Sequence, residues 1–250
     1  MPLKYQIAPN MSFIDDELFG NYDKEIVFSL LKTVDIIFSN SMGVKPFSSS
    51  HCTISYNHFK ANPMCCDSCN GHYIFLYVKE NYWCKWLYQF SHEYCHHLIN
   101  GKMSGDLKGL KWFEETICEL ASMYNLKMMS EVWKYSPEPL KRHFVHSFQD
   151  YLNDLQKEHS LLYEQTLHSK FLQSWDNRLK EPIYHRDLYN AIAVRMFPLF
   201  LQNPHLWKII FHFGDMENWD SLEDLFLHLR RDASPDYSDS LEKLHLLLLS

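Results

Sequence analysis

Apolar residues recur along the first half of the chain with two different periods, and each period predicts one type of secondary structure. Residues 22–40 place an apolar side chain at every third or fourth position, which predicts an amphipathic helix. Residues 71–78 are rich in β-branched and aromatic residues and are followed by a charged turn, which predicts a strand. A shorter strand is predicted over residues 53–56.

Two more helices are predicted after the strand at residues 71–78. The first covers residues 83–99, where apolar side chains fall on one helical face, and it ends at Asn100-Gly101, a typical helix stop. The second covers residues 110–122 and carries a polar stripe beside its packed side. A flexible connection, residues 101–105, is expected to join them.

The chain beyond Pro137 is predicted to be entirely helical. Prolines at positions 182, 204 and 235 lie near the breaks, as expected for a residue without a backbone N–H. The predicted helices span residues 138–158, 161–179, 184–201, 204–213, 221–231 and 240–249. The whole pattern predicts an α+β fold, with a small sheet, helices in front of it and a helical subdomain.

Composition and charge agree with an enzyme rather than a nucleic-acid-binding protein. The chain has 250 residues, enough to bury a full core, with 16% aromatic residues and only 7 glycines. A net charge of −7 argues against nucleic acid as a partner. The first ten residues lack the pattern of a secretory signal, and no apolar run is long enough to span a membrane. We therefore expect a cytoplasmic protein without a membrane partner, and export by a route that needs no signal stays open.

Seven cysteines are present, and an odd number in a chain of this length predicts reduced thiols. Three of them form the cluster Cys65, Cys66 and Cys69, in a loop that is predicted to begin at Asn62-Pro63. The spacing Cys66-x-x-Cys69 also suits structural zinc, but without a second cysteine pair it is a weak signal. Whether this cluster binds a metal stays open at this point.

The clearest chemical signal is His92-Glu93-Tyr94-Cys95-His96, which reads His-Glu-x-x-His within a predicted helix. Histidines four positions apart lie one above the other on a helix, so both imidazoles can bind one zinc ion. Glu93 would then be the general base that takes a proton from water and passes it to the leaving amine. A third protein ligand is required for a zinc site of this kind.

The spacing to the next helix resembles that of the gluzincin zinc metallopeptidases, particularly the M1-type arrangement. Eighteen residues separate His96 from Glu115, and residues 112–116 resemble the family's Trp-Leu-Asn-Glu-Gly segment. The resemblance implies Glu115 as the third zinc ligand, with Glu114 at the family's non-ligand asparagine. Glu119, one turn further on, would accept a hydrogen bond from a ligating histidine.

This resemblance implies a zincin-like fold, and the compact minigluzincins are similar to this chain in the order of their elements. Residues 1–130 would form the metallopeptidase core, and residues 131–250 a helical subdomain that closes the cleft. The strand at residues 71–78 would border the cleft, where an extended peptide could pair with it.

Gluzincins usually take a tyrosine or histidine from the helical subdomain to stabilise the oxyanion, which implies Tyr184, His185 or Tyr189 here. The Gly-x-Met-Glu-Asn element of the M1 aminopeptidases is not found, so the resemblance does not extend to aminopeptidase specificity.

Three functional hypotheses follow from these observations. The first, which we favour, is a zinc-dependent metallopeptidase that acts on a peptide or protein substrate. The second is a module that binds zinc but does not cleave, either latent or inactive, and serves as an interaction site. The third is a helical interaction protein in which the motif is fortuitous. The sequence leaves open the substrate, endo- or exopeptidase cleavage and the oligomeric state.

Overall fold

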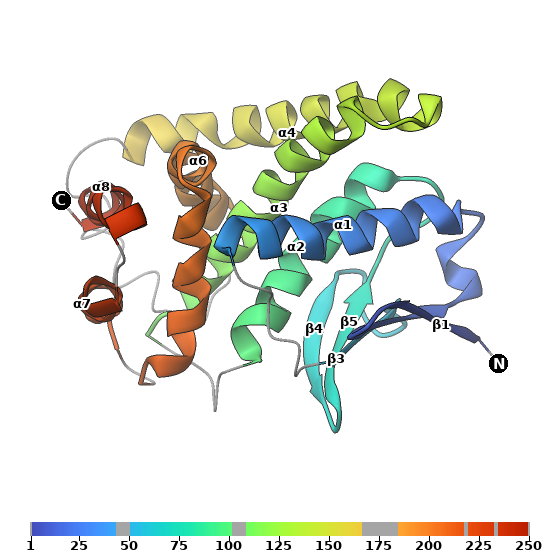
Figure 1. The fold of residues 1–250 in the computed structure, drawn as a ribbon, viewed down its shortest axis with the longest axis horizontal. Coiled ribbons are helices and arrows are strands. Elements are labelled where there is room, and N and C mark those ends of the chain that lie inside the picture. Colours follow the sequence, from blue (N-terminus) through green and yellow to red (C-terminus); the bar gives the residue numbers. More distant parts are fainter. Residues whose placement is uncertain are drawn as a thin grey trace.

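A computed structural model describes residues 2–43, 51–101, 109–166, 185–217, 220–232 and 235–249, and all structural statements below concern these residues. The fold is α+β, with one small mixed sheet and a larger number of helices (Figure 1). The sheet lies at one end of the molecule and the helices α7 and α8 lie at the other. The general fold class predicted from the sequence is therefore confirmed.

The sheet has five strands in the order β1-β2-β3-β5-β4. These strands are β1 (Leu3–Ala8), β2 (Met11–Asp15), β3 (His51–Tyr56), β4 (Met64–Ser68) and β5 (Gly71–Leu76). The three central strands are parallel to one another, whereas β1 and β4 run antiparallel to their neighbours. Among the described strands, β1 and β4 therefore form the two edges of the sheet.

Three helices form the first half of the helical part, and the first two of them pack against strands of the sheet. The first is α1 (Lys24–Met42), where the side chain of Asp23 caps the amino end and Gly43, in the left-handed conformation at φ 67°, ends the helix. It is followed along the chain by α2 (Trp83–Asn100) and α3 (Lys111–Lys134), which carry the predicted site residues. A short 3₁₀ turn, η1 (Glu17–Phe19), precedes α1.

The carboxyl-terminal part is helical in every described segment. Its elements are α4 (Pro139–Thr166), α6 (Arg186–Gln202), the 3₁₀ segment η2 (Pro204–Asp215), α7 (Leu222–Asp232) and α8 (Pro235–Leu249). The break predicted between residues 158 and 161 is wrong, because α4 continues through it. The rest of the helix predicted to residue 179 lies outside the described residues.

An aromatic cluster fixes α2 against the sheet side of the molecule. The Trp86 ring lies 4.7 Å from that of Phe19 and 5.4 Å from that of Tyr22, measured between centroids. Its indole N–H donates to the carbonyl of Glu80 at 2.9 Å. All residues from Trp86 to Ile99 are buried. The two predicted metal-binding histidines therefore stand on a helix that is held on all sides rather than on a surface helix.

Two features of the sheet differ from the prediction. The predicted cysteine loop is the edge strand β4, because its residues pair antiparallel with β5 over five positions. As a consequence, β5 is an interior strand with neighbours on both sides, and the strand that offers an edge is β4. The amino-terminal strands β1 and β2 were not predicted, since their short alternating segments are hard to distinguish from loops.

The boundary predicted between residues 130 and 131 falls inside α3, so a single helix belongs to both predicted parts. On the far side of that boundary, α4 and α6 pack against α3 and against each other. None of the helices in the described ranges has the length and apolar character needed to cross a membrane.

We predict that Gly71→Ala destabilises the protein severely. Gly71 has φ 123°, and a Cβ atom there would lie 2.0 Å from the carbonyl oxygen of His51 on β3. The strained φ and the overpacked contact should lower the free energy of unfolding by about 2–5 kcal/mol, as measured by urea denaturation. Gly43→Ala is the matched control, because the nearest atom to its Cβ is 3.6 Å away. It should cost about 1–2 kcal/mol, from the left-handed backbone alone, and equal losses in the two variants would contradict this account.

Candidate metal centre

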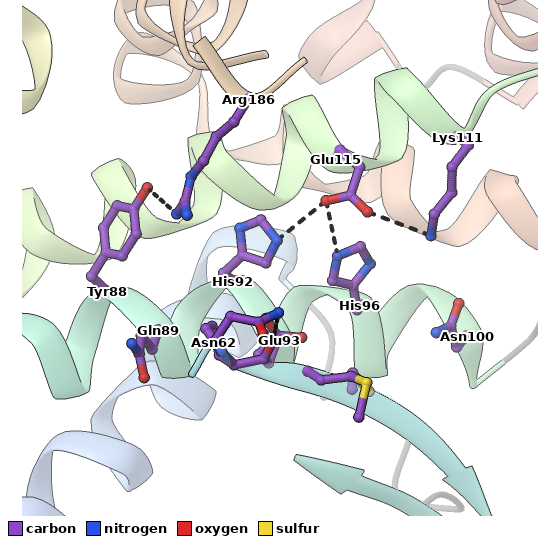
Figure 2. A pocket seen from close by; sticks show the side chains of 13 residues that line it. Asn62, Tyr88, Gln89, His92, Glu93, His96, Asn100, Lys111, Glu115 and Arg186 are labelled. Carbon is purple, nitrogen blue, oxygen red and sulfur yellow. Dashed lines mark hydrogen bonds and ion pairs between the residues drawn. The ribbon is translucent and has the colours of Figure 1, made fainter. Parts of the chain in front are cut away.

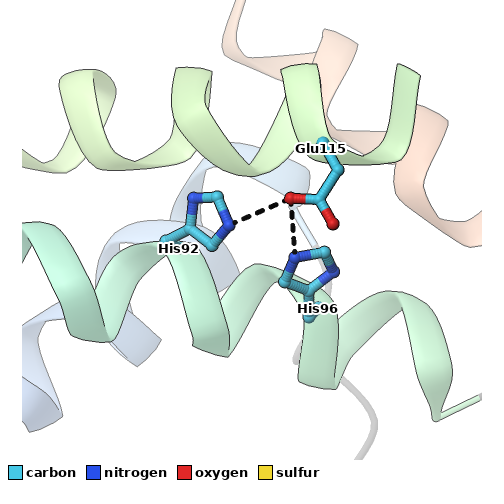
Figure 3. Close-up of side chains that lie close together, drawn as sticks. All are labelled: His92, His96 and Glu115. Atoms are coloured by element: carbon cyan, nitrogen blue, oxygen red, sulfur yellow. Dashed lines mark ion pairs between the residues drawn. The ribbon is translucent and has the colours of Figure 1, made fainter. Parts of the chain in front are cut away.

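Two helices bring three potential ligands together. His92 and His96 lie one turn apart on α2, with ring centroids 5.0 Å apart, and Glu115 faces them from the first half of α3 (Figure 3). The oxygen Oε2 of Glu115 lies 3.4 Å from Nε2 of His92 and 3.5 Å from Nε2 of His96. Among the described residues, this is the one group of three His, Cys, Asp or Glu ligand atoms within 4.8 Å of one another.

The two distances from Glu115 to the imidazole nitrogens fit a small tetrahedral ion, and all three ligand atoms lie within 4.8 Å of one another. Ligands about 2.0–2.1 Å from a central zinc ion are about 3.3–3.4 Å apart in a regular tetrahedron. The two distances from Glu115 to the imidazole nitrogens are within 0.2 Å of that range. Two imidazoles and one carboxylate are also a usual ligand set of catalytic zinc.

The charges around the site also favour a bound cation. Four carboxylates, those of Glu93, Glu114, Glu115 and Glu119, gather around the two histidines, and three of them are buried. Within the described residues, two basic side chains contact this group, Lys111 and Arg186. With all four carboxylates ionised, the excess would be two negative charges, the charge of one divalent cation, and the raised pKa of Glu93 reduces this excess. Protonation of the two histidines is the alternative way to balance them.

His96 is held by a carboxylate that the sequence did not indicate. Its Nδ1 lies 2.6 Å from Oε1 of Glu114, and Lys111 Nζ lies 3.2 Å from the other oxygen of that carboxylate. Burial alone would lower the pKa of His96, but Glu114 and Glu115 outweigh it and raise that pKa well above its ordinary value. In the sequence, Glu114 directly follows the apolar pair Trp112-Phe113. That position was the one available signal that Glu114 is buried.

Glu115 is strongly stabilised as an anion. Burial would raise its pKa, but hydrogen bonds and charge from His92 and His96 hold the pKa well below that of an ordinary glutamate. Lys111 Nζ lies 3.6 Å from its second oxygen, Oε1, so the two oxygens of this carboxylate face different partners. The oxygen that faces the histidines is therefore the one left to bind a metal ion.

His92 faces the predicted outer carboxylate, Glu119, at a longer distance. Nδ1 of His92 lies 3.7 Å from Oε1 of Glu119, and neither of these buried atoms has a hydrogen bond. The second oxygen of Glu119 accepts a hydrogen bond from the hydroxyl of Tyr88, and Arg186 Nε lies 3.1 Å from Oε1. A metal ion on Nε2 would fix the imidazole with its proton on Nδ1, directed at Glu119.

Glu93 lies outside this ligand group but borders the same pocket. It is 5% exposed and hydrogen-bonded to the backbone of Cys65 on β4. Burial raises its pKa, and His92 and His96 offset part of that rise. A carboxylate with a raised pKa is a stronger base than an exposed glutamate, as a general base requires.

The pocket itself has a volume of about 300 Å³ and is walled by four segments (Figure 2). Its floor is α2 from Tyr88 to Asn100, and one wall is α3 through Lys111 and Glu115. A second wall is formed by Asn62 and Pro63 and by the first two residues of the edge strand β4, Met64 and Cys65. Arg186, the first residue of α6, reaches into the pocket from the carboxyl-terminal part of the chain.

Of the three residues implied as oxyanion donors, the two that the structure describes, His185 and Tyr189, do not line this pocket. Tyr184 lies outside the described residues. His185 precedes α6 and accepts backbone hydrogen bonds from Leu188 and Tyr189, and neither His185 nor Tyr189 is part of the pocket wall. Arg186, which lies between them in sequence at the start of α6, does line the pocket, and its side chain points toward α2 (Figure 2).

The cysteines do not form a second group of ligands within the described residues. All seven are free, and Cys65 and Cys66 point to opposite faces of β4, as successive strand residues do. Cys69 is exposed in the turn that follows this strand. The structural-zinc alternative therefore finds no support in the geometry.

We predict that zinc stabilises the protein more strongly as the pH rises. In the metal-free protein, the raised pKa of His96 contributes stability that is present below about pH 6.5 and is lost as the pH rises through the folded-state pKa. Zinc requires the imidazole without its Nε2 proton, so its stabilising effect should increase over the same range. The difference in Tm between zinc-loaded and chelator-treated protein, measured from about pH 6 to about pH 8, tests this.

Glu114→Gln is the matched variant for this prediction. Without the carboxylate, the pKa of His96 should fall, and the effect of zinc on Tm should depend less on pH. A zinc effect on Tm that is independent of pH in the wild-type protein would contradict the assignment of His96.

No protein-family model matches this chain, and no curated protein matches it in sequence. The site itself offers three features that bear on function. Three ligand atoms lie within 4.8 Å of one another, the buried carboxylate of Glu93 borders the same pocket, and the edge strand β4 forms one wall of that pocket.

Proposed function

We propose that this protein is a zinc-dependent metallopeptidase that hydrolyses peptide bonds with Glu93 as the general base. The observation that carries the proposal is the arrangement of four side chains in one pocket. His92, His96 and Glu115 direct ligand atoms at a common point, while Glu93 borders the same pocket without joining them. A separate base beside a three-ligand site is what hydrolysis requires beyond metal binding.

The chemistry divides between the metal and the chain. Zinc held by His92, His96 and Glu115 would supply a Lewis acid that activates water and polarises a carbonyl group. The carboxylate of Glu93 accepts the proton of the attacking water and later delivers it to the leaving amine. Its burial and raised pKa suit both steps, because the group must first gain a proton and then release it.

The edge strand β4 supports a peptide as the substrate. It pairs with β5 on one side, and residues 62–65 border the pocket. An extended peptide can add to such an edge through main-chain hydrogen bonds, which places a peptide bond beside the metal ligands. The other walls are helical, from α3 and the start of α6, so the pocket lies between a strand and helices.

This arrangement also favours a zincin-like fold and the gluzincin resemblance. Supporting features are a small sheet with an antiparallel edge strand, the helix that carries both histidines, and the next helix with the glutamate. The helical part of the chain contributes Arg186 to the pocket, in line with a subdomain that closes the cleft.

Zinc content is the first test. Protein purified without added metal should contain about one zinc ion per chain by elemental mass spectrometry, and the double variant His92→Ala/His96→Ala should contain none. The control is His58→Ala, which removes an exposed histidine that pairs with Asp16. Zinc retained in the double variant but lost in Cys66→Ser/Cys69→Ser would place the metal at the cysteines and overturn the assignment.

Glu93→Gln is the test of mechanism. The variant should keep its zinc, because Glu93 is not a ligand, but should lose activity on a peptide library by about 100- to 10,000-fold, because the base is gone. Glu25→Gln, at an exposed position on α1, is the control for loss of one negative charge. Equal cleavage by wild type and Glu93→Gln would contradict the role of Glu93 as the general base. Zinc binding without any cleavage by the wild type would instead favour a non-cleaving interaction module.

A further inference from the structure

The outer ring nitrogens of the two histidines are held differently. Nδ1 of His96 lies 2.6 Å from Glu114, at hydrogen-bond distance. Nδ1 of His92 lies 3.7 Å from Oε1 of Glu119, and both of these atoms are buried without a hydrogen bond. Oε1 of Glu119 has an ion-pair partner in Arg186, 3.1 Å away, so the buried Nδ1 of His92 is the costly atom, and a small movement that joins it to Oε1 would be favourable.

Each outer carboxylate has its own basic partner, but the two partners bind differently. Lys111 Nζ lies 3.2 Å from Oε2 of Glu114, the oxygen that does not contact the imidazole. Arg186 Nε lies 3.1 Å from Oε1 of Glu119, the same oxygen that faces His92. Arg186 therefore contacts directly the atom that His92 needs as its acceptor.

Arg186 is itself fixed by contacts to the two metal-bearing helices. Its Nη2 donates to the hydroxyl of Tyr88 on α2 at 3.2 Å, and that hydroxyl donates to Glu119 on α3. The guanidinium also lies over the Tyr88 ring, 5.8 Å from the centroid. Its backbone begins α6, so one side chain joins the carboxyl-terminal helices to both helices of the site (Figure 2).

We propose that Arg186 is a positioning residue for the metal ligand His92 and acts on it through Glu119. A metal ion on Nε2 leaves the proton of the imidazole on Nδ1, where an acceptor fixes the ring and strengthens the ligand. The 3.7 Å separation must shorten to about 2.9 Å for that hydrogen bond. Arg186 holds Glu119 within reach and supplies the positive charge that this fully buried carboxylate needs. The inference rests on the proposed metal centre but not on peptide cleavage.

The test is a double-mutant cycle on zinc affinity, measured by competition with a chromophoric zinc chelator in the absence of substrate. Arg186→Gln and Glu119→Gln should each weaken zinc binding by about 10- to 100-fold. The double variant Arg186→Gln/Glu119→Gln should bind zinc about as tightly as the single variant with the lower zinc affinity, because Arg186 acts through Glu119. Arg186→Lys should lie between wild type and Arg186→Gln, since lysine keeps the charge but not the planar fork.

Lys111→Met provides the matched control, because Lys111 contacts Glu114 and Glu115 and neither His92 nor Glu119. In the double variant Lys111→Met/Arg186→Gln, the fold-losses of zinc affinity of the two single variants should multiply. Wild-type zinc affinity in Arg186→Gln, or losses that multiply between Arg186→Gln and Glu119→Gln, would overturn the proposal. If Arg186→Gln does not fold, as judged by circular dichroism, Glu119→Gln is compared with Glu119→Gln/Arg186→Lys, and a further loss of affinity overturns it.

The two proposals fail in different ways. A wild-type protein that binds zinc but cleaves no peptide contradicts the peptidase and leaves the role of Arg186 intact. A wild-type protein that binds no zinc contradicts both. A cleaving enzyme whose zinc affinity is indifferent to Arg186 contradicts the positioning role alone.

Discussion

The packing of α2 against α3 is the constraint on which the whole site depends. Helix geometry alone sets the spacing of His92 and His96, but Oε2 of Glu115 reaches 3.4 and 3.5 Å from their nitrogens only because the second helix lies alongside at one register. A buried hydrogen bond from Ser122 to the carbonyl of Tyr88 fixes that register, together with the fully buried apolar residues of α3. Sliding α3 by one turn, about 5.4 Å, would remove the third ligand.

The polar contacts of the site form layers that extend outward from this packing. Each histidine faces a glutamate from α3, and each glutamate contacts a basic side chain at the edge of the pocket. The basic residues come from different places, Lys111 from the start of α3 and Arg186 from the start of α6. Buried carboxylates are tolerated only with such partners. In the described part of the chain, the excess of carboxylates over basic side chains gives a physical reason why a cation suits the centre.

The sheet contributes to the pocket separately, because the start of its edge strand β4 forms one wall. β4 borders the pocket because β5 is inserted between it and β3, and that insertion depends on Gly71. The carbonyl of His51 lies where a Cβ atom of any other residue would be, so this position accepts only glycine without displacement of β3. Gly71, which does not line the pocket, thus constrains how β5 pairs with β3.

The sequence by itself determined the local elements and the local part of the site. The periods of apolar residues predicted α1, α2, α3 and β5, and the i, i+4 spacing predicted the histidine pair with Glu93 between them, because these features depend on neighbours within one or two turns. The family resemblance indicated Glu115, which the structure brings to the pair.

Only the tertiary structure decided the rest. It showed that β4 and not β5 is the edge, that Glu114 is buried against His96, and that Arg186 lines the pocket whereas His185 and Tyr189 do not. Each of these depends on contacts between segments distant in the chain, and no local period encodes such contacts.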